Sequence, residues 1–169
     1  MDKILLSIKG LLVTAIATPW SPLSDIKKVY YGDPIVVPEC DMPAIIVHPE
    51  NTDITMTWSR YDKKNHAISV KLIYNLKAFL GGSDPSKITA VQDSIKKIED
   101  SNENHEIMSN TITWIIQKNV SLPYDNNWTT RHAAELARVT SIAYPFTQNR
   151  GFPAYEVIVS VEAIAIGNR

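Results

Sequence analysis

The chain has 169 residues, of which 44% are hydrophobic and 21% charged, and its formal net charge at pH 7 is −1. This length and composition predict one globular domain over residues 1–169. The near balance of charge argues against a dedicated nucleic-acid-binding domain, which needs a basic surplus to neutralise phosphates. The single cysteine, Cys40, excludes an internal disulfide and a cysteine-rich metal cluster, and it fits a reducing compartment.

The first predicted element is an amphipathic helix over residues 4–17, where apolar side chains recur at steps of three and four. Lys9 and Gly10 interrupt the apolar run, so we interpret it as a helix that packs on the domain and not as a signal peptide. The helix is expected to end before Pro19, because the residue before a proline resists the helical conformation. No later stretch approaches the ~20 apolar residues of a membrane span, so we expect no membrane contact.

Prolines mark the next segment, residues 19–43, as a long loop. Pro34, Pro38 and Pro43 block a helix and a central strand. We therefore expect an extended surface connection here, with at most a short edge segment.

Two alternating runs then predict a β-hairpin. Residues 44–48 form a short apolar strand that Pro49 is expected to end, and residues 53–60 alternate between apolar and polar side chains. Residues 67–76 alternate again. The polar segment between these runs, residues 60–66, is predicted to be the charged turn.

A second amphipathic helix is predicted over residues 85–100, with Asp84 as its cap and Pro85 at its first position. Residues 107–118 are ambiguous, because their isoleucine spacing suits a helix while their β-branched content suits a strand. We favour a strand or a short helical turn. Residues 119–130 are expected to form a long loop.

The chain closes with a second predicted hairpin, made of strands 136–144 and 154–166 and a proline-bounded tip over residues 145–153. Two hairpins and two helices predict an α+β domain. Its sheet should be mostly antiparallel, with the two amphipathic helices packed on one face.

The sequence contains no phosphate-binding loop, no dinucleotide-binding motif and no nucleophile elbow. His132 and Glu135 lie three apart and could share a helix face, but a zinc site needs three or four convergent ligands. The flanking carboxylates of Glu39 and Asp41 disfavour a thiolate nucleophile at Cys40. We therefore expect no catalytic, cofactor-binding or metal-binding residues, and no enzymatic activity.

Aromatic and charged residues in the predicted loops and turns are the candidate interface, because tyrosine and tryptophan are common anchors of protein contacts. The same rings could instead tuck the loops onto the core. The candidates are Tyr30, Tyr31, Asp62, Lys63, Lys64, Tyr124, Trp128, Phe146, Arg150 and Phe152. Stiff strands with adhesive loops favour an assembly protein over an enzyme.

The sequence presents six features in this order: the predicted helix at 4–17, Tyr31-Gly32-Asp33-Pro34, the strand at 43–47 closed by Pro49, the hairpin at 54–76, the helix after Asp84-Pro85, and the last strand pair around Asn149-Arg150-Gly151. This order resembles that of the tail terminator proteins of tailed bacteriophages, also called tail-completion or minor tail proteins of the U type. The resemblance covers most of the chain, but the loop at 119–130 has no counterpart in it.

The resemblance implies a homo-oligomeric ring, a hexamer, that caps the tail tube, stops its growth and joins it to the head or neck. Its partners would be further copies of the chain, the tail tube protein and a head-completion or neck protein, while DNA merely passes through the lumen. No catalysis and no cofactor are implied, and the site of action would be the virion, assembled in the host cytoplasm. We expect the turn at 62–66 and the tip residues Arg150 and Phe152 to contact a ring neighbour or the tube.

The sequence leaves three alternative functions open. The nearest is another neck component, such as a head-completion or head–tail joining protein. A small α+β hydrolase or ligand-binding domain would need a pocket near His132. A nucleic-acid processing factor would need a basic stripe built from Lys27–Lys28, Lys63–Lys64 and Lys96–Lys97, but we expect each pair to be a solvated face.

Overall fold

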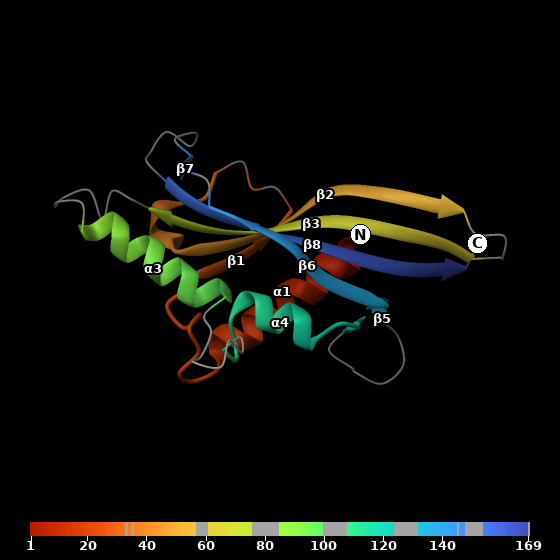
Figure 1. Ribbon diagram of the computed structural model, residues 1–169, viewed down its shortest axis with the longest axis horizontal. Coiled ribbons are helices and arrows are strands. Elements are labelled where there is room, and N and C mark those ends of the chain that lie inside the picture. Colours follow the sequence, from red (N-terminus) through yellow and green to blue (C-terminus); the bar gives the residue numbers. More distant parts are fainter. Residues whose placement is uncertain are drawn as a thin grey trace.

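The computed structural model describes residues 1–32, 34, 36–56, 61–75, 85–99, 108–123, 132–144, 146–147 and 154–168. Over these residues the chain has an α+β fold with one large, mostly antiparallel sheet and three α-helices, which confirms the predicted class (Figure 1). The helices are α1 (Asp2–Ala17), α3 (Pro85–Glu99) and α4 (Ile112–Lys118), with a 3-10 helix η1 (Glu39–Asp41). The strands are β1 (Lys28–Tyr31), β2 (Ala44–Met56), β3 (Tyr61–Asn75), β4 (Leu122–Pro123), β5 (His132–Ala134), β6 (Leu136–Ala143), β7 (Phe146–Thr147) and β8 (Ala154–Asn168).

The large sheet has the strand order β1-β2-β3-β8-β6, and β7 pairs with β8 outside this path. Both predicted hairpins are present, since β2 pairs antiparallel with β3 and β6 pairs antiparallel with β8. Antiparallel pairing of β3 with β8 over the whole length of β3 joins the two hairpins into one sheet. The parallel pair is β1 with β2, and β4 and β5 form a separate small sheet.

The strands of the first hairpin are longer than predicted. β2 runs through Pro49 as one strand, with a register irregularity between Pro49 and Asn51, so the prediction that Pro49 ends the strand is wrong. The physical reason is the position of Pro49: β1 pairs with residues 44–47 of β2, so Pro49 lies where that edge is free and its missing N–H is tolerated. The predicted turn at 60–66 is also wrong, because β3 begins at Tyr61.

The ambiguous segment contains a short helix, α4, so of the two alternatives predicted for residues 107–118 the helical one is present and the strand is not. Thr111 is its N-cap, and the side-chain hydroxyl of Thr111 accepts a hydrogen bond from the N–H of Trp114 at 3.3 Å. Burial of Ile112, Ile115 and Ile116 against the core decides the conformation over the β-branched content.

Short strands lie inside all three of the predicted loops. The connection at 19–43 contains the edge strand β1 and the helix η1, so it is not a continuous loop. The described part of the tip at 145–153 is β7. In the loop at 119–130, residues 122–123 form β4, and residues 124–130 lie outside the described residues.

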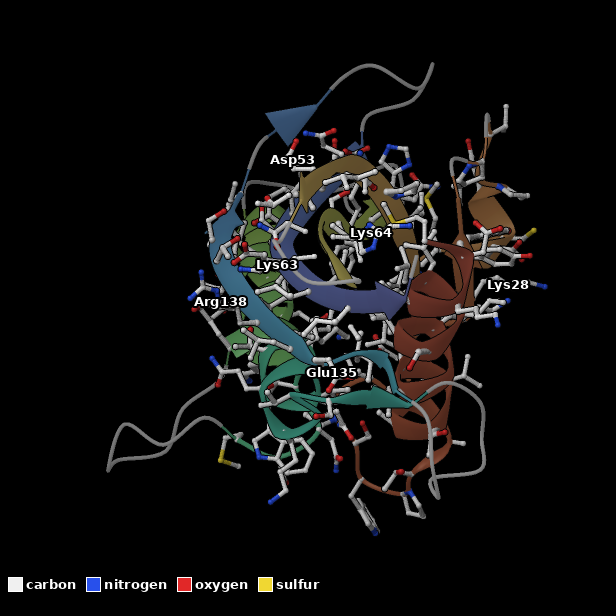
Figure 2. The ribbon with its side chains drawn as sticks, turned by 90° about the vertical axis from the view of Figure 1, so that its right-hand side faces the viewer. Lys28, Asp53, Lys63, Lys64, Glu135 and Arg138 are labelled. Atoms are coloured by element: carbon white, nitrogen blue, oxygen red, sulfur yellow. The ribbon has the colours of Figure 1, made fainter. Side chains whose placement is uncertain are left out.

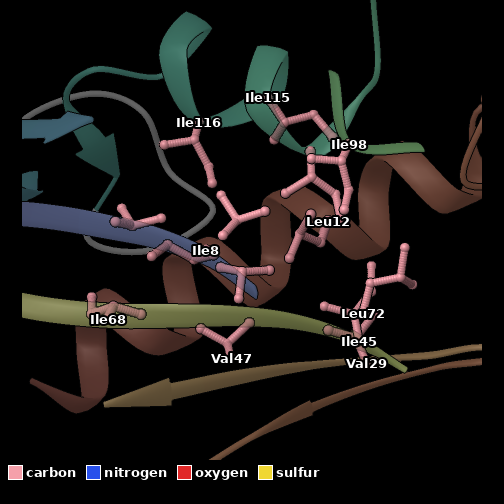
Figure 3. Close-up of a cluster of buried hydrophobic side chains, with 14 of the residues drawn as sticks. Ile8, Leu12, Val29, Ile45, Val47, Ile68, Leu72, Ile98, Ile115 and Ile116 are labelled. Atoms are coloured by element: carbon pink, nitrogen blue, oxygen red, sulfur yellow. The ribbon is translucent and has the colours of Figure 1, made fainter. Parts of the chain in front are cut away.

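The main core lies between the large sheet and the helices, which Figure 1 shows below the sheet. Its buried side chains come from all three α-helices as well as from the sheet, so the helical layer has one helix more than predicted. Figure 3 shows Ile8 and Leu12 of α1, Ile98 of α3 and Ile115 of α4 together with strand residues of this core. A smaller cluster, formed by Val37, Met42, Ala44, Ile46 and Ile73 with Tyr30 against it, holds the segment around η1.

One end of the sheet extends past the helices, at the right of Figure 1. There β2, β3 and β8 continue as a three-stranded ribbon of residues 51–56, 61–66 and 163–168, which we call the arm. Figure 2 views the molecule from this end and shows Asp53, Lys63 and Lys64 on the arm. Ala163 and Ala165, at the base of the arm, still belong to or pack against the main core, whereas the outer part extends beyond the described helices and carries polar residues on both faces (Figure 1).

Candidate interaction surface

Among the described residues, the arm carries strand edges without a strand partner on both sides. β1 pairs with β2 only at Ala44–Val47, so the outer edge of β2 from His48 to Met56 has no strand partner among the described residues. On the other side, β6 begins at Leu136 opposite Ile164, and β8 continues beyond it to Asn168. Free edges present unpaired N–H and C=O groups that can pair with another chain.

Each face of the arm pairs an exposed isoleucine with a lysine. On one face Lys64 lies directly opposite Ile54, and on the other Lys63 lies directly opposite Ile166. Ile54 is 59% exposed and Ile166 is 58% exposed, although both belong to regular strands. Ile164, partly buried, shares the face of Ile166 because side chains two apart in a strand point to the same side. We call Lys63, Ile164 and Ile166 the outer arm face.

A buried histidine marks the base of the arm. His66 is buried, and its Nδ1 lies 3.0 Å from the hydroxyl oxygen of Thr52 on the neighbouring strand. Burial lowers the pKa of His66 below its usual value, and the charge of Lys64 adds to this effect. The imidazole is therefore neutral at pH 7, and the link to Thr52 fastens β2 to β3 where the ribbon leaves the core.

The predicted interface residues other than Tyr30 and Tyr31 fall into three groups. Asp62, Lys63 and Lys64 belong to β3, so the charged segment projects as part of a strand and not as a turn. The backbone of Phe146 is in β7. Tyr124, Trp128, Arg150 and Phe152 lie outside the described residues.

Tyr30 and Tyr31 lie next to each other in β1, away from the arm. The hydroxyl of Tyr30 donates a hydrogen bond to the carboxylate of Asp41 in η1, and Lys27 Nζ donates to the carbonyl oxygen of Cys40 at 3.2 Å. Tyr31 is 49% exposed, and Lys9 Nζ lies 5.0 Å from the centroid of its ring. Tyr30 thus fastens η1 to the sheet, whereas Tyr31 keeps an accessible face.

The contact between Tyr30 and Asp41 predicts a pH effect. The hydrogen bond to Asp41 raises the pKa of Tyr30 to about 12 from 10.0. The neutral phenol is favoured in the folded state, so its stabilising effect is present below pH 10 and is lost as the pH rises from about 10 through 12. In an ultraviolet difference titration of wild type against Tyr30→Phe, the missing phenol should titrate near 12, and Asp41→Asn should shift that value towards 10. A titration near 10 in wild type would contradict the contact.

Sequence reasoning missed Lys97, the most buried charged side chain among the described residues. Lys97 is 2% exposed, whereas we expected the Lys96–Lys97 pair to be solvated. Its Nζ lies 3.1 Å from Asp25 Oδ2, forms an ion pair with Asp93, and lies 5.8 Å from the centroid of the Tyr74 ring. The Tyr74 hydroxyl donates to Asp93 at 3.0 Å. This cluster joins α3 to the sheet and to the connection after α1, and we assign it a structural role.

The sequence predicted neither a metal site nor a membrane-spanning segment. His132 lies in β5 and Glu135 is exposed beside it, so the two do not share a helix face. Within the described residues, no group of three or more His, Cys, Asp or Glu side chains is arranged to hold a metal ion. No helix in the described part of the chain is long and apolar enough to cross a membrane.

No protein-family model matches the chain, and no curated protein gives a significant sequence match.

Proposed function

We propose that this chain is a structural subunit of the tail of a tailed bacteriophage, a terminator that forms a ring on the tail tube. The ring stops tube growth and offers its other side to the neck of the head. The proposal rests on the element order of the sequence, and the arm is the observation in the structure that supports it best.

In an isolated chain the arm has two disadvantages. A three-stranded ribbon with polar and apolar side chains on both faces gains little from burial, and its free edges invite pairing with other chains. Both costs disappear when a neighbouring copy covers the arm. Because the arm projects from one end, we propose that it contacts a different surface of the neighbouring copy, and such head-to-tail contacts form a ring when the rotation between copies closes.

The charge of the chain fits the same role. A net charge of −1 over 169 residues suits a ring that binds protein on both sides and lets DNA pass without holding it. Lys63 and Lys64 stand opposite apolar or small residues of the neighbouring strands, which favours protein contacts for them.

The direct test uses the tail tube protein encoded with this chain. Tube protein polymerised alone should give tubes of uncontrolled length. Addition of this chain at a low ratio should stop elongation and place ring density at one end in negative-stain electron microscopy. Tubes that keep growing with bare ends would contradict the proposal, and a variant that cannot form rings serves as the control.

A further inference from the structure

Trp20 is the most exposed large apolar side chain among the described residues. It lies in the connection between α1 and β1 and is 99% exposed. An indole gains more from burial than most side chains do, so full exposure forgoes a large stabilising contribution. Tryptophan is also enriched at the few positions that dominate protein interfaces.

The backbone holds Trp20 in a conformation that a bulky residue rarely adopts. The N–H of Ser21 donates to the carbonyl of Thr18 at 3.2 Å, with Pro19 second and Trp20 third in the turn, and Trp20 has φ 64°. This is the pattern of a type II turn, whose third position favours glycine because a Cβ atom crowds the backbone there. Backbone strain and full side-chain exposure therefore coincide at Trp20, and strained backbone positions cluster at functional sites in proteins.

The turn is fastened to the core, so the indole is held outward. Ser21 is buried, and its hydroxyl oxygen accepts a hydrogen bond from the N–H of Leu23 at 3.2 Å. Leu23 is fully buried, and the N–H of Ser24 donates to the carbonyl of Ser21 at 3.0 Å. The position of Trp20 is thus prepared before any partner arrives, which lowers the entropic cost of binding.

The outer arm face has the chemistry that suits an indole. Ile164 and Ile166 offer apolar contact, and Lys63 offers a cation that can lie over the ring. Trp20 cannot reach the arm of its own copy, since α1, about 24 Å long for its 16 residues, runs from the arm side towards the opposite end of the molecule (Figure 1).

We propose that Trp20 of one copy packs on the outer arm face of the next copy, against Lys63, Ile164 and Ile166. The arm of each copy then receives the Trp20 indole of one neighbour. The Trp20 of that same copy packs on the arm of its other neighbour. That ring arrangement rests on the proposed function, but the contact between Trp20 and the arm is testable without a tail tube.

Single variants test the two sides of the contact. Trp20→Gly should weaken self-association about 30-fold or more, as expected for a central anchor, while its melting temperature stays equal or rises because glycine suits this backbone. Ile166→Asp should weaken self-association to a similar extent. Ile54→Asp is the matched control, since Ile54 is equally exposed on the opposite face of the arm. Loss of association in Ile54→Asp but not in Ile166→Asp would overturn the assigned face.

Mixing the two variants decides whether these surfaces meet. Trp20→Gly keeps an intact arm, and Ile166→Asp keeps an intact Trp20, so each should be monomeric alone. Their mixture should form a heterodimer of twice 18.9 kDa through one intact contact, measured by sedimentation velocity. A mixture that stays monomeric, or a wild type that stays monomeric up to about 1 mM, would overturn the proposal. Heterodimers in a chain that fails to cap tubes would uphold the contact and refute only the tail role.

Discussion

Replacing Leu12 with alanine is expected to lower the free energy of unfolding by about 3 kcal/mol. Leu12 is fully buried in α1 and belongs to the core that joins this helix to the sheet and to the other two helices. Truncation removes its burial and leaves a cavity that the regular strands beneath cannot fill. The melting temperature should fall by roughly 10 °C in calorimetry, given about 2–4 °C per kcal/mol at this chain length.

The adjacent residue provides the control for Leu12. Val13 is 46% exposed on the same helix, so Val13→Ala should change the free energy of unfolding by no more than about 0.5 kcal/mol. Equal losses in the two variants would mean that α1 does not pack on the sheet through the face described.

Removal of the Lys97 side chain is the second large expected effect, a loss of about 2 kcal/mol in Lys97→Ala. Breaking a buried ion pair typically costs about 3–5 kcal/mol, because the partner is left as an uncompensated charge. Here Asp25 and Asp93 keep 54% and 40% of their side chains exposed, so water can solvate them once the lysine is gone. We therefore place the loss below that range, and denaturant unfolding measures it.

Two further variants separate charge from packing at Lys97. Lys97→Met removes the charge but keeps an unbranched apolar side chain at this buried position, and it should lose less stability than Lys97→Ala. Lys96→Ala removes an exposed lysine from the same turn of α3 and should have an effect within about 0.5 kcal/mol. If Lys96→Ala and Lys97→Ala lost equal stability, the assigned structural role of the cluster would be wrong.

Alternation of apolar residues predicted the sheet wherever one face is buried. Val157, Val159, Val161 and Ala163 are all buried on one face of β8, as their spacing indicates. The same rule failed at residues 60–66, because beyond buried His66 the side chains of β3 leave the core and polar residues occupy both faces, so apolar alternation has no physical cause there. In α4, the β-branched residues left a strand open beside a short helical turn, and burial together with the Thr111 cap favours the helix over that propensity.

The candidate site was predictable only in part. Lys63 and Lys64 were named because they are charged, and the structure places them on the projecting arm for a reason that the sequence pattern does not contain. Trp20 was not among the candidate residues. Its outward position depends on the type of the turn that contains Pro19 and Trp20, and the sequence pattern does not specify that type. Lys97 looks like Lys96 in sequence, and its burial depends on Asp25 and Tyr74, which are distant along the chain.

Native mass spectrometry across a concentration series is the most direct test of the central claim that copies of this chain join head to tail into a closed ring. The account predicts a closed species near 113 kDa, six times the 18.9 kDa chain, with few larger species. An open-ended series that grows with concentration, or a strict monomer throughout, would contradict it.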